Sequence, residues 1–236
     1  MGRVTAMWRG ALLALGLSVT SGAVMAENPV VIELYTSQGC SSCPPADKLL
    51  HELAKQDGVI ALALHVDYWD YIGWKDQFAD PRFTERQKNY ARAAGARSIY
   101  TPQMIIGGID HVVGAKPAEV SKYLKAHAQK PAVINIAAER NGDAFTLRAR
   151  SAERVGDLTV FVVTYRPVSK VDIKRGENAG RTLSYANVVT SWTEAKRWNG
   201  RGEYRLNADL PTATEPAVVL FQRDGYGEIL AAVELR

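Results

Sequence analysis

The first part of the chain alternates short apolar runs with amphipathic segments. Residues 30–36 form an apolar, β-branched run that predicts a buried strand, and residues 59–66 predict a second one. Between them, residues 44–56 carry apolar side chains at helical spacing, which predicts an amphipathic helix. Two buried strands joined by a helix are typical of a right-handed βαβ unit, so we expect the two strands to run parallel.

Turn and cap signals extend this pattern to about residue 130. An Asp-Pro pair followed later by Gly predicts a helix over residues 81–94. A Gly-Gly pair between two apolar runs predicts a hairpin over residues 103–113. A proline then opens a helix predicted over residues 117–129. The predicted order of elements is therefore β-α-β-α-β-β-α.

The pattern changes at Lys130-Pro131, where alternating segments separated by Asn-Gly and Asp-Gly turns begin. Eight short strands with such turns are typical of a β-sandwich. We therefore expect an α/β domain over residues 27–130 and a β-sandwich-like domain over residues 131–236. The eight strands are predicted at residues 132–138, 144–150, 157–165, 167–174, 182–191, 203–208, 217–222 and 227–235.

Residues 1–26 have the pattern of a secretory signal peptide. Arg3 and Arg9 precede a short apolar stretch, and Val24-Met25-Ala26 resembles a cleavage site. We therefore expect a periplasmic or secreted protein. No later segment approaches the ~20 apolar residues that span a bilayer, so no stable membrane insertion is expected after cleavage.

Charge points to no polyanionic partner. The chain holds 29 Lys and Arg against 25 Asp and Glu, and the basic residues are scattered. A nucleic-acid-binding protein usually concentrates its basic residues in a patch or stripe. The composition therefore favours neither a nucleic acid nor an anionic membrane surface as a partner.

The only two cysteines form a C-x-x-C motif, Cys40 and Cys43, between the first predicted strand and its helix. A helix start presents unpaired N–H groups, which stabilise the thiolate that attacks disulfides. Export permits a disulfide here, but a bridge across two residues constrains the unfolded chain very little. This favours a redox pair over a structural bridge, and we expect the Cys40 sulfur to be open to solvent.

The element order, the C-x-x-C motif and Thr101-Pro102 before the third strand together resemble the thioredoxin superfamily over residues 28–130. The resemblance implies that Cys40 is the attacking cysteine and that Cys43 resolves the mixed disulfide. It also implies that the Thr101–Pro102 bond is cis, faces the disulfide and lies where backbone pairs with a substrate peptide. No cofactor is implied, because the cysteines carry both electrons.

The two-part layout is similar to a family of secreted thioredoxin-like proteins of unknown function. The similarity rests on residues 35–46, 67–74 and 176–183. It extends over nearly all of the chain that follows the predicted signal peptide. It implies relatives rather than an activity, because the family has no agreed one.

An aromatic segment, residues 67–74, follows the second predicted strand at the sheet edge that carries Cys40. Its aromatic residues, Trp69 and Trp74 among them, are candidates for a wall that binds a substrate beside the disulfide. The alternative is that they pack against the second domain and that the aspartates are solvated caps. Carboxylates raise a nearby thiol pKa and hydroxyls stabilise a thiolate. The candidate modulating residues are Asp67, Asp70, Ser41 and Ser42.

These features favour a thiol–disulfide oxidoreductase-like protein that exchanges disulfides with exported proteins carrying cysteine pairs, or with a redox partner. Two alternatives stay open. One is a non-enzymatic binding module, such as an assembly factor, with an inert structural bridge. The other is a copper metallochaperone in which soft thiolates hold Cu(I) with His65 or His111. No zinc-type ligand set appears in the sequence, so we expect no dedicated metal site.

Overall fold

The computed structural model describes residue 2 and residues 28–235. Apart from residue 2, the predicted signal segment lies outside the described residues. None of the helices in the described part of the chain has the length and apolar character needed to cross a bilayer.

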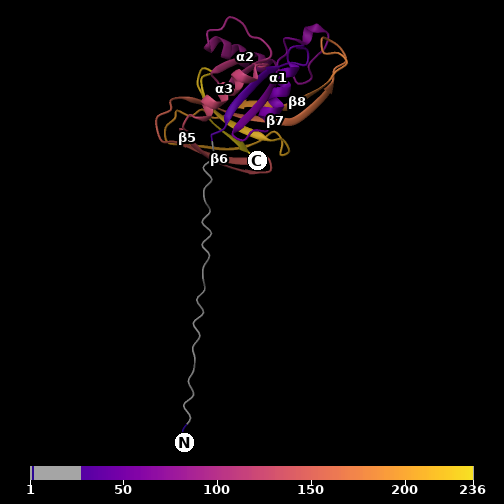
Figure 1. Ribbon diagram of the computed structural model, residues 1–236. Helices are drawn as coiled ribbons and strands as arrows, with labels where there is room; N and C mark the ends of the chain where they lie inside the picture. Colours follow the sequence, from indigo (N-terminus) through magenta and orange to yellow (C-terminus); the bar gives the residue numbers. More distant parts are fainter. Residues whose placement is uncertain (1, 3–27, 236) are drawn as a thin grey trace.

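An eight-stranded sheet runs through the whole molecule in the order β11-β10-β7-β8-β2-β1-β3-β4 (Figure 1). The predicted parallel pairing of the first two strands is confirmed, and β1 also pairs antiparallel with β3. The strands of this sheet are β1 (Val30–Thr36), β2 (Val59–His65), β3 (Gln103–Ile106), β4 (Asp110–Val113), β7 (Leu158–Asp172), β8 (Thr182–Glu194), β10 (Ala217–Arg223) and β11 (Ile229–Leu235).

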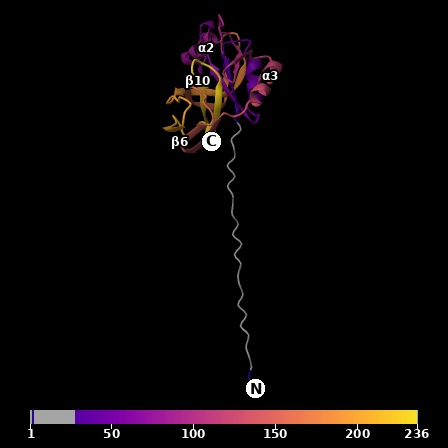
Figure 2. The ribbon, with the colours of Figure 1, turned by 90° about the vertical axis from the view of Figure 1, so that its left-hand side faces the viewer.

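Three α-helices and a short 3-10 helix interrupt the first four strands in the predicted order. They are α1 (Pro44–Leu53), η1 (Asp70–Ile72), α2 (Pro81–Ala93) and α3 (Pro117–Ala128). Alternation along β1 decides which face each helix covers, since successive side chains point to opposite sides. Ile32 and Leu34 pack with α1 and α3, whereas Val31 and Tyr35 pack with α2. The helices α2 and α3 accordingly lie on opposite sides of the sheet (Figure 2).

The second part of the chain differs in detail from the prediction. The strands expected at residues 157–165 and 167–174 are one continuous strand, β7, whose register against β8 shifts between Thr164 and Tyr165. Residues 131–235 therefore hold seven strands rather than eight. Three of them form a separate sheet in the order β5-β6-β9: β5 (Ile134–Asn141), β6 (Ala144–Ser151) and β9 (Glu203–Asp209).

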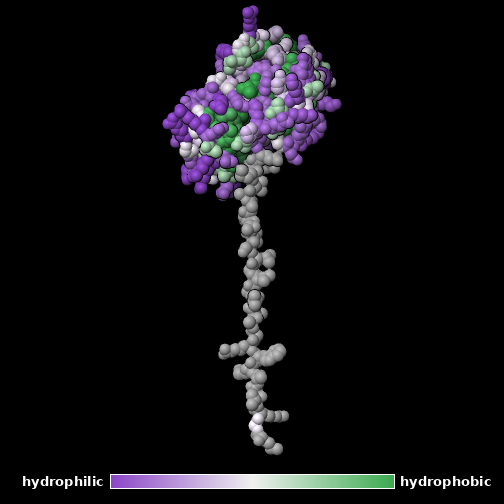
Figure 3. Space-filling model, turned by 60° about the vertical axis from the view of Figure 1, so that its left-hand side comes forward, coloured by the Kyte–Doolittle hydropathy of each residue, from purple (hydrophilic) through white to green (hydrophobic). Residues whose placement is uncertain are grey.

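In the second part of the chain, two β-sheets pack face to face. The small sheet packs on β7, β10 and β11 through a core that includes Phe145, Val160, Val219 and Phe221. The next residues along these strands, such as Val218, point to the opposite face, where α2 lies. The surface in Figure 3 is mainly hydrophilic, and polar residues interrupt its hydrophobic areas.

The two parts of the chain are joined within the large sheet. Strand β8 lies beside β2 and is bridged to it in parallel at Val188 and Ala63. The Asn187 side chain adds a hydrogen bond to the Ala61 carbonyl at 2.8 Å. This pairing brings β8 next to α1, so the second part of the chain packs against that helix.

Candidate functional site

Cys40 and Cys43 form a disulfide at the start of α1, with their Cα atoms 5.4 Å apart. Cys43 is the N-cap residue, and Pro44 occupies the first helical position, where a missing N–H is tolerated. The Cys43 N–H donates to the Cys40 carbonyl at 3.2 Å, which closes the turn between them. The C-x-x-C motif therefore lies at a helix start, as the sequence predicts.

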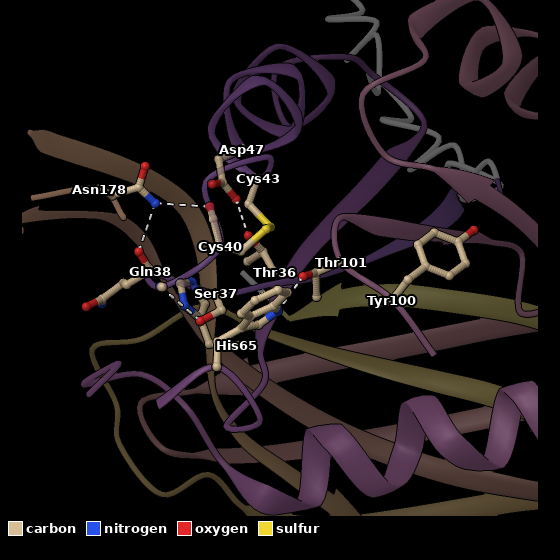
Figure 4. Close-up of a disulfide and its surroundings, with 12 residues drawn as sticks. Thr36, Ser37, Gln38, Cys40, Cys43, Asp47, His65, Tyr100, Thr101 and Asn178 are labelled. Carbon is tan, nitrogen blue, oxygen red and sulfur yellow. Dashed lines mark hydrogen bonds between the residues drawn. A yellow bond between two sulfur atoms is a disulfide. The ribbon is translucent and has the colours of Figure 1, made fainter. Parts of the chain in front are cut away.

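The disulfide is covered rather than open. Cys40 is 1% exposed and Cys43 is 0% exposed, so the expected accessibility of the Cys40 sulfur is wrong for this conformation. The loop between β7 and β8, residues 173–181, supplies one cover. Its Asn178 side chain donates hydrogen bonds of 3.0 Å to the carbonyls of Gln38 and Cys40 (Figure 4).

The aromatic segment supplies the other cover. The Trp69 indole N–H donates to the Thr101 hydroxyl at 2.7 Å, and Thr101 lies on the far side of the disulfide from Asn178 in Figure 4. A methyl group placed on Gly39 would lie 3.1 Å from the Trp69 Cβ, so this segment touches the residue before Cys40. The Thr101–Pro102 bond is cis, as the resemblance implies.

The two covers also meet each other. The Trp74 indole N–H donates to the Gln38 side chain at 2.8 Å, and Gln38 is in turn held by Asn178. A Cβ on Gly176 of the β7–β8 loop would lie 3.2 Å from the Trp74 Cβ. Trp69 and Trp74 therefore contact residues that flank the disulfide, and Trp74 also packs against the second part of the chain.

A buried carboxyl group lies one helical turn beyond Cys43. Asp47 is four residues further along α1, on the same face of the helix. Its carboxylate accepts a hydrogen bond of 2.8 Å from the Thr36 hydroxyl (Figure 4). Burial raises the pKa of Asp47 to about 7, although His65 and the Thr36 hydrogen bond lower it. Asp47 can therefore hold or release a proton near neutral pH.

A second buried polar pair lies under α1. The His65 Nδ1 atom is 2.7 Å from an Asp76 carboxylate oxygen that also accepts the Gln38 N–H. Burial raises the pKa of Asp76, but His65 and backbone N–H groups more than offset this and hold it below its ordinary value. An ionised carboxylate only accepts hydrogen bonds, so Nδ1 carries a proton and donates it in a hydrogen bond to Asp76.

Three polar atoms around this pair have no partner among the described residues. They are the His65 Nε2, the Tyr185 hydroxyl and the Gln38 side-chain nitrogen. Tyr185 comes from β8, and its ring meets the His65 ring edge-on at 4.8 Å. The second part of the chain thus contributes both a cover over the disulfide and a wall of the polar enclosure beneath it.

None of the four predicted modulating residues forms a hydrogen bond with a cysteine sulfur among the described residues. Asp67 accepts a 2.5 Å hydrogen bond from the Thr84 hydroxyl and so anchors the segment to α2. Asp70 accepts the Asp76 N–H at 3.0 Å and shapes the loop. Ser41 and Ser42 are exposed, and neither forms a hydrogen bond through its hydroxyl within the described residues.

Sequence reasoning missed the residues that do lie at the disulfide. Asp47 carries a usable signal, because position i+4 from a cysteine in a helix shares its face. Asn178 lies in residues 176–183, one of the stretches on which the family similarity rests, but no local signal indicates its contact with Cys40, which is 138 residues away in the chain.

The structure offers little for a metal ion. In the described part of the chain, no group of three or more His, Cys, Asp or Glu side chains converges on one point. His65 is committed to Asp76. His111, the other candidate Cu(I) ligand, lies 3.3 Å from the Gln103 side chain and packs against Tyr90.

Comparisons with solved structures extend over most of the chain. A crystal structure of a protein from Agrobacterium tumefaciens is 31% identical, with a TM-score of 0.76 over 87% of this chain and 93% of that chain. HBP35 of Porphyromonas gingivalis is 14% identical, with a TM-score of 0.58 over 88% of this chain and 74% of that chain. The second likeness concerns the fold alone. No curated protein matches the chain.

The family comparison covers the sheet, the disulfide and its two covers. A model described as "Protein of unknown function (DUF1223)" matches residues 31–222. The match runs from β1 to β10, so it includes both parts of the chain. The chain therefore belongs to this family of proteins of unknown function, DUF1223.

Proposed function

We propose that this protein is an exported thiol–disulfide exchange protein built on a thioredoxin-like domain, and that its disulfide is held covered until a partner opens it. One observation carries the proposal. The only two cysteines are joined at the start of α1, with the proton-holding Asp47 buried on the same helix face. A structural bridge has no need of a nearby carboxyl group that titrates near neutral pH.

The exchange starts when a thiolate of the partner attacks the Cys40 sulfur. A new disulfide forms between the partner and Cys40, the Cys40–Cys43 bond breaks, and Cys43 leaves as a thiolate. Protonated Asp47 can supply the proton that this thiolate takes up. A second partner thiolate then attacks the mixed disulfide and releases Cys40. The partner loses two electrons and becomes a disulfide, and this protein becomes the dithiol; in the reverse sequence the dithiol of this protein reduces a partner disulfide.

Access requires the covers to open. Asn178 and Trp69 hold the two sides of the disulfide through three hydrogen bonds, none of which belongs to a helix or a strand pair. Loops held by a few such bonds open at much lower cost than the folded core. The Thr101 hydroxyl and the backbone beside Pro102 then become available to an extended segment of the partner, with Trp69 and Trp74 beside it.

A second candidate function has its own observation. Cys40 is 1% exposed, which favours a binding module whose disulfide fixes the loop under the aromatic segment. The two functions differ in redox potential. An exchange protein should equilibrate with glutathione buffers at a midpoint between roughly −120 and −270 mV, whereas a structural bridge should lie below about −300 mV.

Trapping tests the proposal in the native compartment. Cys43→Ala leaves Cys40 without its resolving partner, so mixed disulfides should accumulate on Cys40 and disappear in the Cys40→Ala, Cys43→Ala double variant. A midpoint below about −300 mV, together with an empty trap, would show that the bridge is structural.

A further inference from the structure

A cavity of about 310 Å³ lies on the opposite face of the sheet from the disulfide-bearing helix. It opens between α2, strands β7 and β8 and the turn that joins β10 to β11. Its walls are mainly apolar, and Phe83, Phe161, Trp192 and Tyr226 supply most of the rings. A volume near 300 Å³ with apolar walls and a few polar groups is typical of small-molecule sites.

The polar group of this cavity is Arg86, which is 5% exposed. Its Nε and Nη2 atoms bind the Glu33 carboxylate at 2.7 and 2.8 Å. Nη2 also donates to the Tyr90 hydroxyl and to the Gln222 side chain. Tyr35 and Tyr90 donate two further hydrogen bonds to Glu33, so the carboxylate is fully used.

The remaining nitrogen of Arg86, Nη1, carries two N–H bonds, and no described residue accepts either of them. Nη1 is not fully enclosed by protein, and Arg86 lines the cavity, so these donors open on it.

The rings around Arg86 fix the direction of these donors. The guanidinium carbon lies 3.9 Å from the centre of the Trp192 ring and 5.1 Å from that of Phe161. Stacking on Trp192 sets the plane of the guanidinium, and the bonds to Glu33 set its rotation within that plane. A ligand that reaches Nη1 therefore meets a preoriented donor between aromatic walls.

The turn between β10 and β11 adds the Tyr226 ring to the cavity wall. Gly225 and Tyr226 have φ values of +73° and +61°, the left-handed backbone that a tight hairpin turn uses. Tyr226 packs against Tyr90, at 5.5 Å between ring centres, and its hydroxyl accepts a hydrogen bond from Asn89. The turn therefore fixes one aromatic wall of the cavity.

Charge decides which acceptor the cavity suits. Glu33 already neutralises Arg86, and it is completely buried. A ligand carboxylate would bring a second negative charge close to Glu33 without a second cation inside the cavity. The charged groups at the rim are also paired: Arg82 with Asp80 and Glu85 with Lys88. An uncharged oxygen can accept from Nη1 without this repulsion.

We propose that this cavity binds a small uncharged molecule with an aromatic or apolar body and a carbonyl oxygen that accepts from Arg86 Nη1. The site is separate from the disulfide, and the proposal is independent of thiol–disulfide exchange.

Three ring compounds of similar size test the assignment: benzamide, benzoate and toluene. Each compound is titrated into the full-length protein. Binding is followed by the NMR chemical shifts of the Trp192 indole and of the Arg86 side chain. We expect benzamide to bind most tightly. Toluene, which lacks the acceptor, and benzoate, which is charged, should each bind about tenfold more weakly, as expected for the loss of one such hydrogen bond.

Two variants locate the binding. Phe161→Leu keeps an apolar wall but removes a ring, and it should weaken benzamide binding at least threefold. Tyr71→Ala changes a residue that is 81% exposed and does not line the cavity, so it should leave binding unchanged. The proposal is overturned if no lining residue shifts, if Phe161→Leu has no effect, if toluene equals benzamide, or if benzoate binds more tightly than benzamide.

Discussion

Replacing Asn178 with alanine should open the cover over the disulfide. Asn178 is 1% exposed and reaches across from the β7–β8 loop to the carbonyls of Gln38 and Cys40. Alanine keeps the backbone of the loop and removes only the amide group. The change therefore affects the attachment between the two parts of the chain and leaves both cysteines and the start of α1 as they are.

The magnitude follows from the two hydrogen bonds. Each contributes about 0.5–1.5 kcal/mol net, so the closed state should lose about 1–3 kcal/mol relative to an open one. Since 1.4 kcal/mol is a factor of ten, the open fraction should rise about 5- to 150-fold. Trp69→Phe removes one hydrogen bond, to Thr101, and should raise the open fraction about 2- to 12-fold.

The assay is the rate at which a small dithiol reduces the disulfide, followed by trapping of the new thiols at successive times. When opening is fast and rarely populated, this rate is proportional to the open fraction. Asn207→Ala is the matched control, because Asn207 is an exposed asparagine on β9, far from the disulfide in the fold. Urea unfolding of each variant separates local opening from a general loss of stability.

Equal reduction rates for the native protein and Asn178→Ala would refute this reasoning. Equal rates would mean that the Asn178 amide does not limit access to the disulfide. Some other barrier, such as unfolding of α1, would then set the rate of reduction. A faster rate that is fully accounted for by a lower unfolding free energy would refute it as well, because the disulfide would then become accessible only in the unfolded chain.

Three further changes test the energetics. Asp47→Asn should raise the unfolding free energy at pH 8 and change it little at pH 4. Because the pKa of Asp47 is raised in the folded protein, the unfolding free energy of the native protein should fall by on the order of 4 kcal/mol between about pH 4 and pH 7. This fall should be absent from the variant in urea unfolding measured at a series of pH values. Glu33→Gln should cost about 3–5 kcal/mol, since it leaves Arg86 buried without its counter-charge. Glu85→Gln removes one partner of an exposed ion pair and should cost much less, and equal costs in urea would contradict this. Gly107→Ala should lower the unfolding free energy by about 1–3 kcal/mol more than Gly142→Ala does. Both glycines have positive φ, but only at Gly107 would a Cβ lie 2.2 Å from the His127 ring. Thermal unfolding of the two variants measures the difference.

The elements up to residue 130 could be predicted because their signals are local. In each case the residues of the segment itself indicate its conformation, as in the strand at residues 30–36, the helix start at Asp80-Pro81 and the Gly-Gly turn at 107–108. The strands after residue 131 were also located by turns and alternation. Their partners were not, because pairing depends on contacts between distant residues: nothing near Val188 indicates that it lies beside Ala63.

The candidate site was likewise predictable only where local motifs or the family resemblance indicate it. The cysteine motif and the cis bond at Thr101–Pro102 lie where the motif and the resemblance place them. The accessibility of Cys40 was predicted wrongly, because the first part of the chain considered alone does not include Asn178. Asp67 and Asp70 were chosen for their nearness in sequence to the aromatic segment, yet they stabilise the loop through Thr84 and the Asp76 backbone.

The second part of the chain supplies part of the surroundings of the disulfide. Strand β8 adjoins β2 in the large sheet, and this one pairing places the β7–β8 loop over Cys40 and Tyr185 beneath α1. A partner that displaces Asn178 must therefore act on both parts of the chain at once. The same pairing ties the state of the disulfide to the position of the β7–β8 loop. Reduction would release the Cys40–Cys43 turn to which Asn178 is bonded, so loop and disulfide should loosen together rather than separately.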